Sequence, residues 1–237
     1  MSKLQKLLFG IWILCFSQPL FAQQNPGTAA DMDSVNNPAK WKVKTIAPGI
    51  VYKKAVINIF NSCQKIYVTE IDQSYEDNYI GLFNTSPSVT KLHTKAAALN
   101  ATAAVNGTYC YTATDGTGIF SSDYLYINDT VVKNYTNSSV KARAPGAFTI
   151  YDGKVNIIPY NTSAESYTQF GSAQDGMTCG PALLFGGVYQ DLSQISNADF
   201  GGANPVRHPR TAVGTNGDKV YFVVVDGRQG TQVAAGM

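Results

Sequence analysis

Charged side chains and histidines are scarce in this sequence. Only 14% of the 237 residues are charged, and the two histidines are His93 and His208. The chain contains neither the Gly-Lys-Ser loop that binds nucleotide phosphates nor the Gly-x-Ser-x-Gly turn of the α/β-hydrolases. A serine–histidine hydrolase would therefore depend on one of these two histidines. The cysteines and histidines also lack the spacing of zinc ligands, so we expect neither a metal nor another cofactor.

Long hydrophobic runs are absent as well. The longest, Leu7–Phe16, is about half as long as a membrane-spanning helix. It follows Lys3 and Lys6 and precedes Ser17–Ala22, which ends in a small residue. A basic, an apolar and a small-residue part in this order are typical of a secretory signal peptide. We expect residues 1–22 to be cleaved, the protein to be secreted or periplasmic, and no stable membrane insertion after cleavage. An uncleaved membrane anchor is the alternative.

The net charge disappears with the signal peptide. The whole chain has 18 basic and 16 acidic residues, and the signal peptide removes Lys3 and Lys6. The remaining positive and negative charges are equal in number. A neutral protein does not attract nucleic acid over a long range, so nucleic acid is not an expected partner. Recognition must instead depend on a local site.

The composition predicts one strand-rich domain. A mature chain of about 215 residues can bury a core within a single domain, and it is rich in Tyr, Thr, Asn, Gly and Val. Residues 23–40 are polar and are interpreted as a flexible leader, and residues 41–237 as the folded domain. We expect an α+β fold with a mixed sheet and few helices.

Short apolar segments separated by turn residues predict the strands. One helix is expected at residues 88–100, where Ser88 can cap the first turn and Asn100 can end the last. Asp152-Gly153 and Gly186-Gly187 predict tight hairpins. The expected strands are 50–60, 65–71, 101–105, 122–127, 131–135, 147–151, 155–159, 181–185, 188–190, 210–213 and 220–225.

Four segments place glycine beside a polar residue at the end of an expected strand. They are Ala104–Thr108, Cys179–Leu184, His208–Gly214 and Val223–Arg228. Each alone is compatible with an ordinary turn, because Asn-Gly and Asp-Gly are common in hairpins. Their order along the chain is more specific than any one of them.

Together these motifs resemble the phosphodiester glycosidase family. The segment Ala47–Tyr52 is similar to the family's entry motif, and the other motifs follow in the family's order. These are an Asn-Gly turn, Gly-Pro-x-Leu, Pro-Arg-Thr-Ala-Val-Gly and a strand that ends in Asp-Gly-Arg. The resemblance covers Ile46–Met237, although the family's Asn-Gly-Gly-Phe-Phe turn is here Asn-Gly-Thr-Tyr-Cys. Since the family continues beyond Gly236-Met237, we expect the domain to be incomplete at its C-terminus.

The resemblance implies a hydrolase that cleaves the sugar C1–O bond of a sugar-1-phosphodiester, with an N-acetylglucosamine-like sugar attached to phosphate. The phosphate leaving group needs a fixed cation, and the planar guanidinium of arginine can hold phosphate through two hydrogen bonds. The oxocarbenium-like transition state needs a carboxylate near the anomeric carbon. The implied site residues are catalytic Asp226 and Arg210, and substrate-binding Asn106, Gly107, Arg228 and His208.

Each implied role has a structural alternative. Arg210 could form a salt bridge, for example with Asp226, and Asp226 or Asn106 could simply form a turn. Cys110 and Cys179 flank two site segments and are the candidate pair for a disulfide in an oxidising compartment. Two buried, unpaired thiols are the alternative. For the whole protein, the alternatives to a hydrolase are a carbohydrate- or phosphate-binding protein without catalysis and a truncated fragment.

Overall fold

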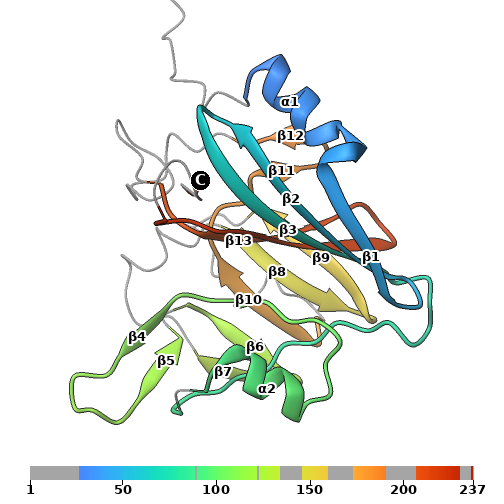
Figure 1. The fold of residues 1–237 in the computed structure, drawn as a ribbon. Helices are drawn as coiled ribbons and strands as arrows, with labels where there is room; N and C mark the ends of the chain where they lie inside the picture. The colour runs from blue at the N-terminus through green and yellow to red at the C-terminus, as the bar shows by residue number, and fades with distance from the viewer. Residues whose placement is uncertain are drawn as a thin grey trace, which may run out of the picture.

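The computed structural model describes residues 27–88, 90–121, 123–133, 146–159, 173–190, 207–229 and 236. The expected signal peptide, residues 1–22, lies outside this part of the chain. The described strands form two five-stranded sheets and two short two-stranded hairpins. Two α-helices, α1 (Ala29–Asn36) and α2 (Leu92–Ala98), accompany them, and these lie at opposite ends of the molecule (Figure 1).

The first sheet brings together the early and the late part of the domain. Its order is β1 (Trp41–Ala47), β2 (Ile50–Ile59), β3 (Ser62–Asp72), β14 (Lys219–Val225) and β13 (Arg210–Thr215). Phe60 and Asn61 join β2 to β3 with φ values of 52° and 57°, as a tight type I′ turn requires. The expected strands at 50–60, 65–71, 210–213 and 220–225 are therefore confirmed.

The second sheet contains shorter strands. Its order is β7 (Thr130–Lys133), β6 (Leu125–Ile127), β10 (Asp175–Cys179), β8 (Gly146–Tyr151) and β9 (Lys154–Pro159). Asp152 and Gly153 have φ values of 47° and 69° and form the expected turn between β8 and β9. The smaller hairpins are β4 (Cys110–Thr112) with β5 (Ile119–Ser121), and β11 (Leu184–Phe185) with β12 (Val188–Tyr189). Gly186 and Gly187 form the expected turn of the latter.

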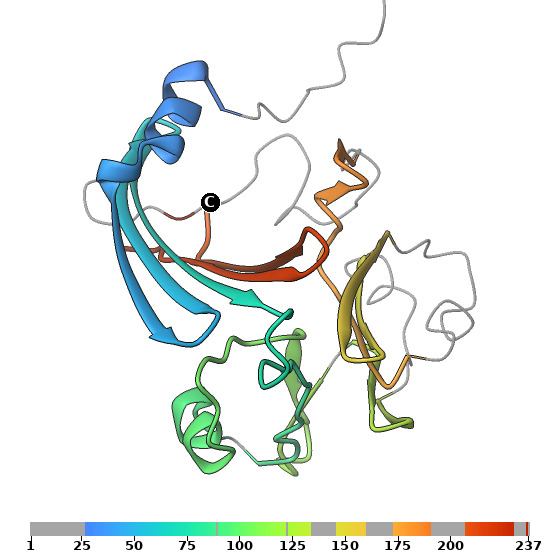
Figure 2. The same cartoon turned by 90° about the vertical axis from the view of Figure 1, so that its right-hand side faces the viewer.

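An apolar cluster lies on each face of the first sheet. On one face, Val220 of β14 packs with Phe148, Ile150 and Val155 of the second sheet, so this cluster joins the two sheets. On the other face, a second cluster contains Ala55, Ile57, Ile59, Ile66 and Val225. Figure 2 shows the second sheet beside the β13–β14 end of the first, while β1 and β2 extend away from it.

Helix α1 corrects the expectation of a flexible leader. Thr28 and Asp31 form a capping box at its start, and Asp31 Oδ1 also accepts the Phe60 N–H at 3.1 Å. Val35 packs against the apolar cluster on β2 and β3, and its carbonyl accepts the Trp41 indole N–H at 2.8 Å. A short 3-10 turn, Pro38–Lys40, then leads into β1. Packing and capping together therefore order a segment whose composition is polar.

Helix α2 is shorter than the expected helix at residues 88–100. It begins after Lys91, which makes no side-chain capping bond, so the expected cap at Ser88 is wrong. Its end agrees with the expectation, because Asn100 has a φ of 52° and the Ala101 N–H reaches back to the Ala96 carbonyl at 2.9 Å. This is the hydrogen-bond pattern of a Schellman motif. The strand expected at 101–105 does not form.

The expectation of a mixed sheet is also wrong for the described residues. Every strand pair among them is antiparallel. Consecutive strands that pair, such as β2 with β3, β8 with β9 and β13 with β14, are joined by turns too short for a parallel crossover. The result is a strand-rich fold with few helices. No helix in the described ranges is long and apolar enough to cross a membrane.

Candidate functional site

The candidate site lies where β14 ends and β13 begins. Asp226, Gly227 and Arg228 follow β14, and His208 and Pro209 precede β13. Because the two strands are antiparallel, both segments meet at one edge of the sheet. A Cβ atom on Gly227 would lie 2.6 Å from the Pro209 nitrogen and 2.9 Å from the His208 carbonyl carbon. The Asp-Gly-Arg motif therefore needs glycine so that these two backbone segments can approach each other.

Arg228 and His208 form a side-chain pair at this edge. The Arg228 Nε and one terminal nitrogen lie 3.3 and 2.9 Å from His208 Nδ1. A guanidinium can only donate, so His208 Nδ1 is the acceptor in these hydrogen bonds. Arg228 has a φ of 61°, a conformation that costs a non-glycine residue about 1 kcal/mol. The hydrogen bonds to His208 help to hold the exposed guanidinium in place.

Asp226 is positioned by β3. Its N–H donates to the Lys65 carbonyl at 3.0 Å, and its Oδ2 accepts the Tyr67 hydroxyl at 3.1 Å. Burial raises the pKa of Tyr67, and the hydrogen bond and charge of Asp226 raise it further. Tyr67 therefore remains a protonated donor at any ordinary pH. The Lys54 Nζ lies 5.2 Å from the centre of the Tyr67 ring, which places a cation over the residue that donates to this carboxylate.

The Asn106-Gly107 segment, which does not form the expected turn, contacts both sheets. The Thr211 hydroxyl of β13 donates to Asn106 Oδ1 at 2.7 Å. A Cβ on Gly107 would lie 2.9 Å from the sulfur of Met177, which belongs to β10. The segment thus contacts β13 of the first sheet and β10 of the second, and the hydrogen bond from Thr211 fixes the side-chain amide of Asn106.

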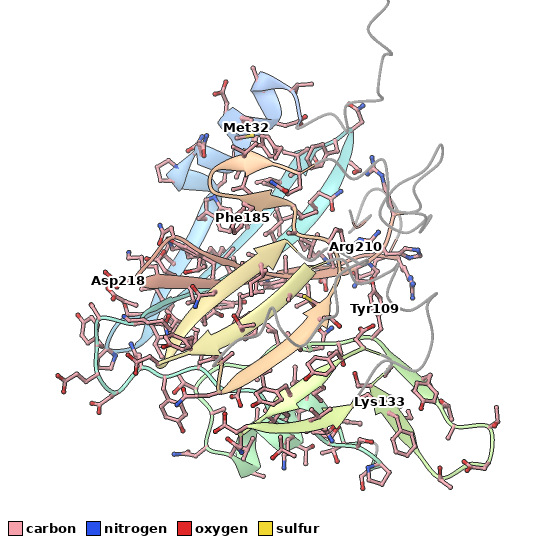
Figure 3. All side chains as sticks on the ribbon, turned by 180° about the vertical axis from the view of Figure 1, so that it is seen from behind. Met32, Tyr109, Lys133, Phe185, Arg210 and Asp218 are labelled. Carbon is pink, nitrogen blue, oxygen red and sulfur yellow. The ribbon has the colours of Figure 1, made fainter. Side chains whose placement is uncertain are left out.

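Arg210 lies at the same edge but at a different register position. It is paired with Val225, which belongs to the apolar cluster that α1 covers. Side chains alternate between the faces of a strand. Arg210 is therefore assigned to the face of Val225, whereas Asp226 and Tyr67 belong to the opposite face. Figure 3 shows Arg210 at the open end of the β13–β14 hairpin and Asp218 at its turn.

The structure thus brings together most of the residues that the resemblance implies. Asp226, Arg228 and His208 share one edge, and Asn106 is held above the same face by Thr211. Three neighbours were missed from sequence: Tyr67, Lys54 and Thr211. The alternating pattern of β2, β3 and β13 indicates which side chains share a face within one strand. It does not indicate which strands become neighbours, so these contacts had no signal before the register was known.

The candidate disulfide between Cys110 and Cys179 is not formed. Cys110 is exposed in the β4–β5 hairpin, opposite Ser121. Burial raises the pKa of the Cys179 thiol to about 12, with a smaller contribution from the charge of Asp123. The two residues stand in different sheets and different environments. Both thiols are unpaired, but the expectation that both are buried is wrong for Cys110, which is exposed.

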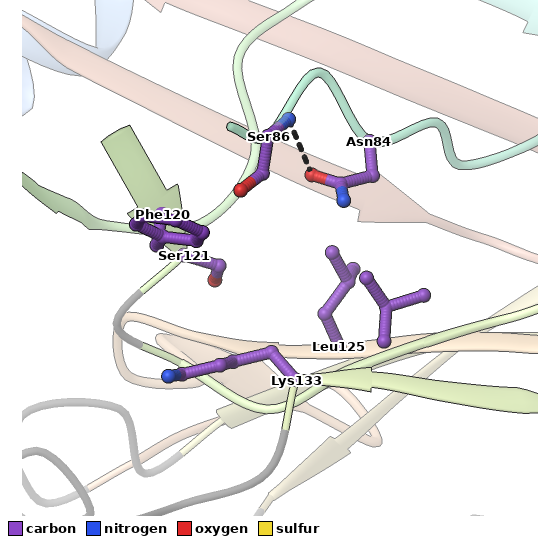
Figure 4. Close-up of a pocket in the computed structure, with 7 residues that line it drawn as sticks. Asn84, Ser86, Phe120, Ser121, Leu125 and Lys133 are labelled. Carbon is purple, nitrogen blue, oxygen red and sulfur yellow. Dashed lines mark hydrogen bonds between the residues drawn. The ribbon is translucent and has the colours of Figure 1, made fainter. Parts of the chain in front are cut away.

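No group of three or more potential metal ligands occurs in the part of the chain that is described. A small pocket is lined by residues of β5, β6 and β7 and of the loop that contains Asn84 and Ser86 (Figure 4). None of its lining residues was predicted for the site. Asn84 accepts the Ser86 N–H there at 3.0 Å. Ser121, which also lines it, donates to Thr108 at 2.8 Å. The pocket therefore adjoins the loop that carries Asn106 without containing any of the residues discussed above.

Fold and site together define a strand-rich protein with a carboxylate and an arginine–histidine pair at one sheet edge. A family model described as phosphodiester glycosidase matches residues 99–237. Since this is more than half of the chain, the protein belongs to the phosphodiester glycosidase family. The matched range contains every implied site residue, while the Ala47–Tyr52 motif precedes it.

Similarity outside the family model is confined to the fold. The chain is similar to the crystal structure of a hypothetical protein from Synechocystis, with a TM-score of 0.50 and 11% sequence identity. The similarity covers 82% of this chain and 54% of the other, so this chain spans about half the length of that protein. No curated protein matches the sequence.

Proposed function

We propose that the protein is an exported hydrolase that cleaves the bond between a sugar C1 and the oxygen of a phosphodiester. The sugar is proposed to be N-acetylglucosamine-like. The observation that carries this proposal is the edge at which Asp226, held by Tyr67, lies two residues from the Arg228–His208 pair. Membership of the phosphodiester glycosidase family supports the same substrate class.

Asp226 is the proposed catalytic carboxylate. Departure of a phosphate leaves positive charge on the sugar ring, and a carboxylate beside the anomeric carbon stabilises that charge. The Tyr67 hydroxyl donates to Oδ2, one of the two carboxylate oxygens. Oδ1 is the oxygen proposed to face the sugar, as nucleophile, base or electrostatic stabiliser.

An arginine at this edge is proposed to hold the departing phosphate. Arg210 follows from the family motif, but its register position is on the Val225 face. Arg228 lies two residues after Asp226 in the loop that follows β14, is exposed, and is oriented by His208. These observations favour Arg228 as the principal phosphate ligand, with Arg210 as the second candidate. A bidentate guanidinium would neutralise the leaving group without needing a proton.

Asn106 and Gly107 are proposed to bind the sugar. The Thr211 hydroxyl occupies the Asn106 carbonyl oxygen, so the amide NH₂ is the group proposed to donate to a sugar hydroxyl. Gly107 has no side chain between the sugar and the backbone. Both residues belong to the face that carries Asp226, which supports a single binding site.

The test is hydrolysis of N-acetylglucosamine α-linked through phosphate to methyl mannoside, carried out in ¹⁸O-labelled water. The expected product is labelled free sugar, because cleavage at C1–O puts the solvent oxygen on the sugar. Asp226→Asn should lower turnover about a thousandfold. Asp218→Asn is the matched control, since that carboxylate is 74% exposed at the far turn of the hairpin.

Two results would overturn the proposal. Label in the phosphate would show that the P–O bond breaks. A folded wild-type protein that binds this diester without cleaving it would be a carbohydrate- or phosphate-binding protein. The proposed export has a separate test: N-terminal sequencing of protein from the extracellular or periplasmic fraction should begin at Gln23, and protein that retains Met1 in the cytoplasm would contradict it.

A further inference from the structure

A second surface adjoins the Asp226 side of the first sheet. It consists of the lysine and tyrosine side chains of β1–β3 that share the face of Tyr67, and we call it the lysine face: Lys42, Lys44, Tyr52, Lys54, Lys65 and Tyr67. The strand register assigns these side chains to one face, because Lys42 is paired with Lys54, and Lys54 with Tyr67. Lys42 and Lys44 are exposed, and the others are half-buried.

The lysine face has no acidic residue of its own. Neither β1 nor β2 contains an Asp or Glu, and β3 contains only Glu70 and Asp72. Both are at the register positions of the opposite face. There Glu70 pairs with Lys53 at 2.6 Å and with Lys219 at 2.5 Å. The sheet therefore neutralises its lysines on one side and leaves four of them together on the other.

The arrangement carries a stability penalty. Lys42 and Lys54 lie directly opposite each other on neighbouring strands, and like charges in this position destabilise a sheet by roughly 0.2–1 kcal/mol. Lys54 lies above the Tyr67 ring, and the Lys65 ammonium donates to Gln229 at 3.4 Å. An anion bound across Lys42 and Lys54 would remove the repulsion between them.

The lysine face is continuous with the proposed site. One row of paired residues crosses the sheet from Lys42 through Lys54, Tyr67 and Val224 to Thr211. Strands lie about 4.8 Å apart, so Lys42 is about 10 Å from Tyr67 along this row. Tyr67 binds Asp226 and Thr211 binds Asn106. A chain bound at Asp226 would therefore reach the lysines within a few sugar units.

We infer that the lysine face binds the continuation of an acidic glycan, in which further phosphate or carboxylate groups follow the linkage that reacts at Asp226. This inference rests on the proposed function and names its substrate class as a polymer or oligomer with several negative charges. Charge complementarity selects an anion, and continuity with a sugar-phosphate site selects a glycan. The net charge of the whole chain is only +2, so we expect attraction to come from this face and not from the whole protein.

The test compares a four-sugar oligomer joined by phosphodiesters with the single diester described above. The variant is Lys42→Gln/Lys44→Gln, and Lys91→Gln/Lys95→Gln is the control with the same charge change at the remote helix α2. We expect kcat/KM for the oligomer to fall about tenfold in the first variant, since exposed ion pairs each contribute a modest factor. Activity on the single diester should stay within about twofold, and both substrates should be unaffected in the control variant.

Binding of a fluorescent oligomer, measured by anisotropy, separates this inference from the proposed function. If the single diester is hydrolysed but oligomer binding and turnover do not depend on Lys42 and Lys44, the inference is overturned and the function stands. If nothing is hydrolysed but oligomer binding falls about tenfold in the variant, binding of the acidic glycan by the lysine face stands and the proposed hydrolysis fails. Equal, lysine-dependent binding of an oligonucleotide with matched charge would overturn the assignment to a glycan.

Discussion

The two faces of the first sheet differ in what covers them. On the face of Ile57 and Val225, α1 and an apolar cluster exclude water, and Glu70 neutralises the neighbouring lysines. On the other face, β13 and β14 pack against the second sheet through Val220, whereas β1–β3 present the lysine face. Side chains alternate between the two faces along each strand, so the same strands supply a core on one side and a charged surface on the other.

This comparison explains why neighbours in the sequence motifs separate in space. Arg210 and Asp226 belong to adjacent motifs and reach the same sheet edge. Their register positions assign them to opposite faces, because Arg210 is paired with Val225 and Asp226 comes one residue later. Motif order identifies the edge at which chemistry is proposed, and strand alternation decides which side chains can act on one substrate.

The largest effect on stability is expected from Ile57 of β2, in contrast to its neighbour Val56. Ile57 is 4% exposed within the apolar cluster, while Val56 is 53% exposed on the opposite face. Ile57→Ala should lower the free energy of unfolding by about 3 kcal/mol, and Val56→Ala by less than about 0.5 kcal/mol. Denaturant unfolding measures both. Similar losses for the two variants would show that the faces are not covered as described.

Tyr67 connects the two regions of the polar face. Tyr67→Phe removes the hydroxyl that donates to Asp226 and keeps the ring beneath Lys54. Because hydrogen bonds to charged groups contribute about 1.5–3 kcal/mol, we expect kcat on the single diester to fall about tenfold. Tyr52→Phe, on the same face, is the control and should leave kcat unchanged. Equal rates for wild type and Tyr67→Phe would remove Tyr67 from the site.

Glu70 is expected to have a smaller, pH-dependent effect. Its hydrogen bonds to Lys219 and then to Lys53 lower its pKa below the ordinary value of 4.5. The stabilisation is therefore fully present above pH 4.5 and is lost as the pH falls through the lowered pKa. Glu70→Gln should lower the free energy of unfolding by about 1 kcal/mol at pH 7. The difference from wild type should shrink below pH 4.

The control for Glu70→Gln is Asp218→Asn. Asp218 pairs with Lys154 at 3.3 Å, but the two side chains are 74% and 50% exposed. An exposed pair of this kind contributes little, so Asp218→Asn should be close to wild type at every pH. A pH-independent loss in Glu70→Gln would contradict the account of this ion cluster.

The sequence predicts the strands and turns that form the site better than it predicts the contacts between side chains from distant strands. The strands at 50–60 and 220–225 and the turn at Asp152-Gly153 were predictable, because β-branched runs and turn residues are local signals. Helix α1 was missed, although Thr28-x-x-Asp31 is a capping signal, because the surrounding composition is polar. The contact between Tyr67 and Asp226 joins residues 159 positions apart. Only the pairing of β3 with β14 creates that contact.

The most direct test of the account is a comparison of Arg228→Ala with Arg210→Ala on the single diester. We expect Arg228→Ala to lower kcat/KM about a hundredfold, because it removes a charge-assisted contact to the leaving phosphate. Arg210→Ala, on the Val225 face, should lower kcat/KM less than about tenfold. A reversed order, with Arg228→Ala close to wild type and Arg210→Ala inactive but folded, would contradict the assignment of the chemistry to the Asp226 face.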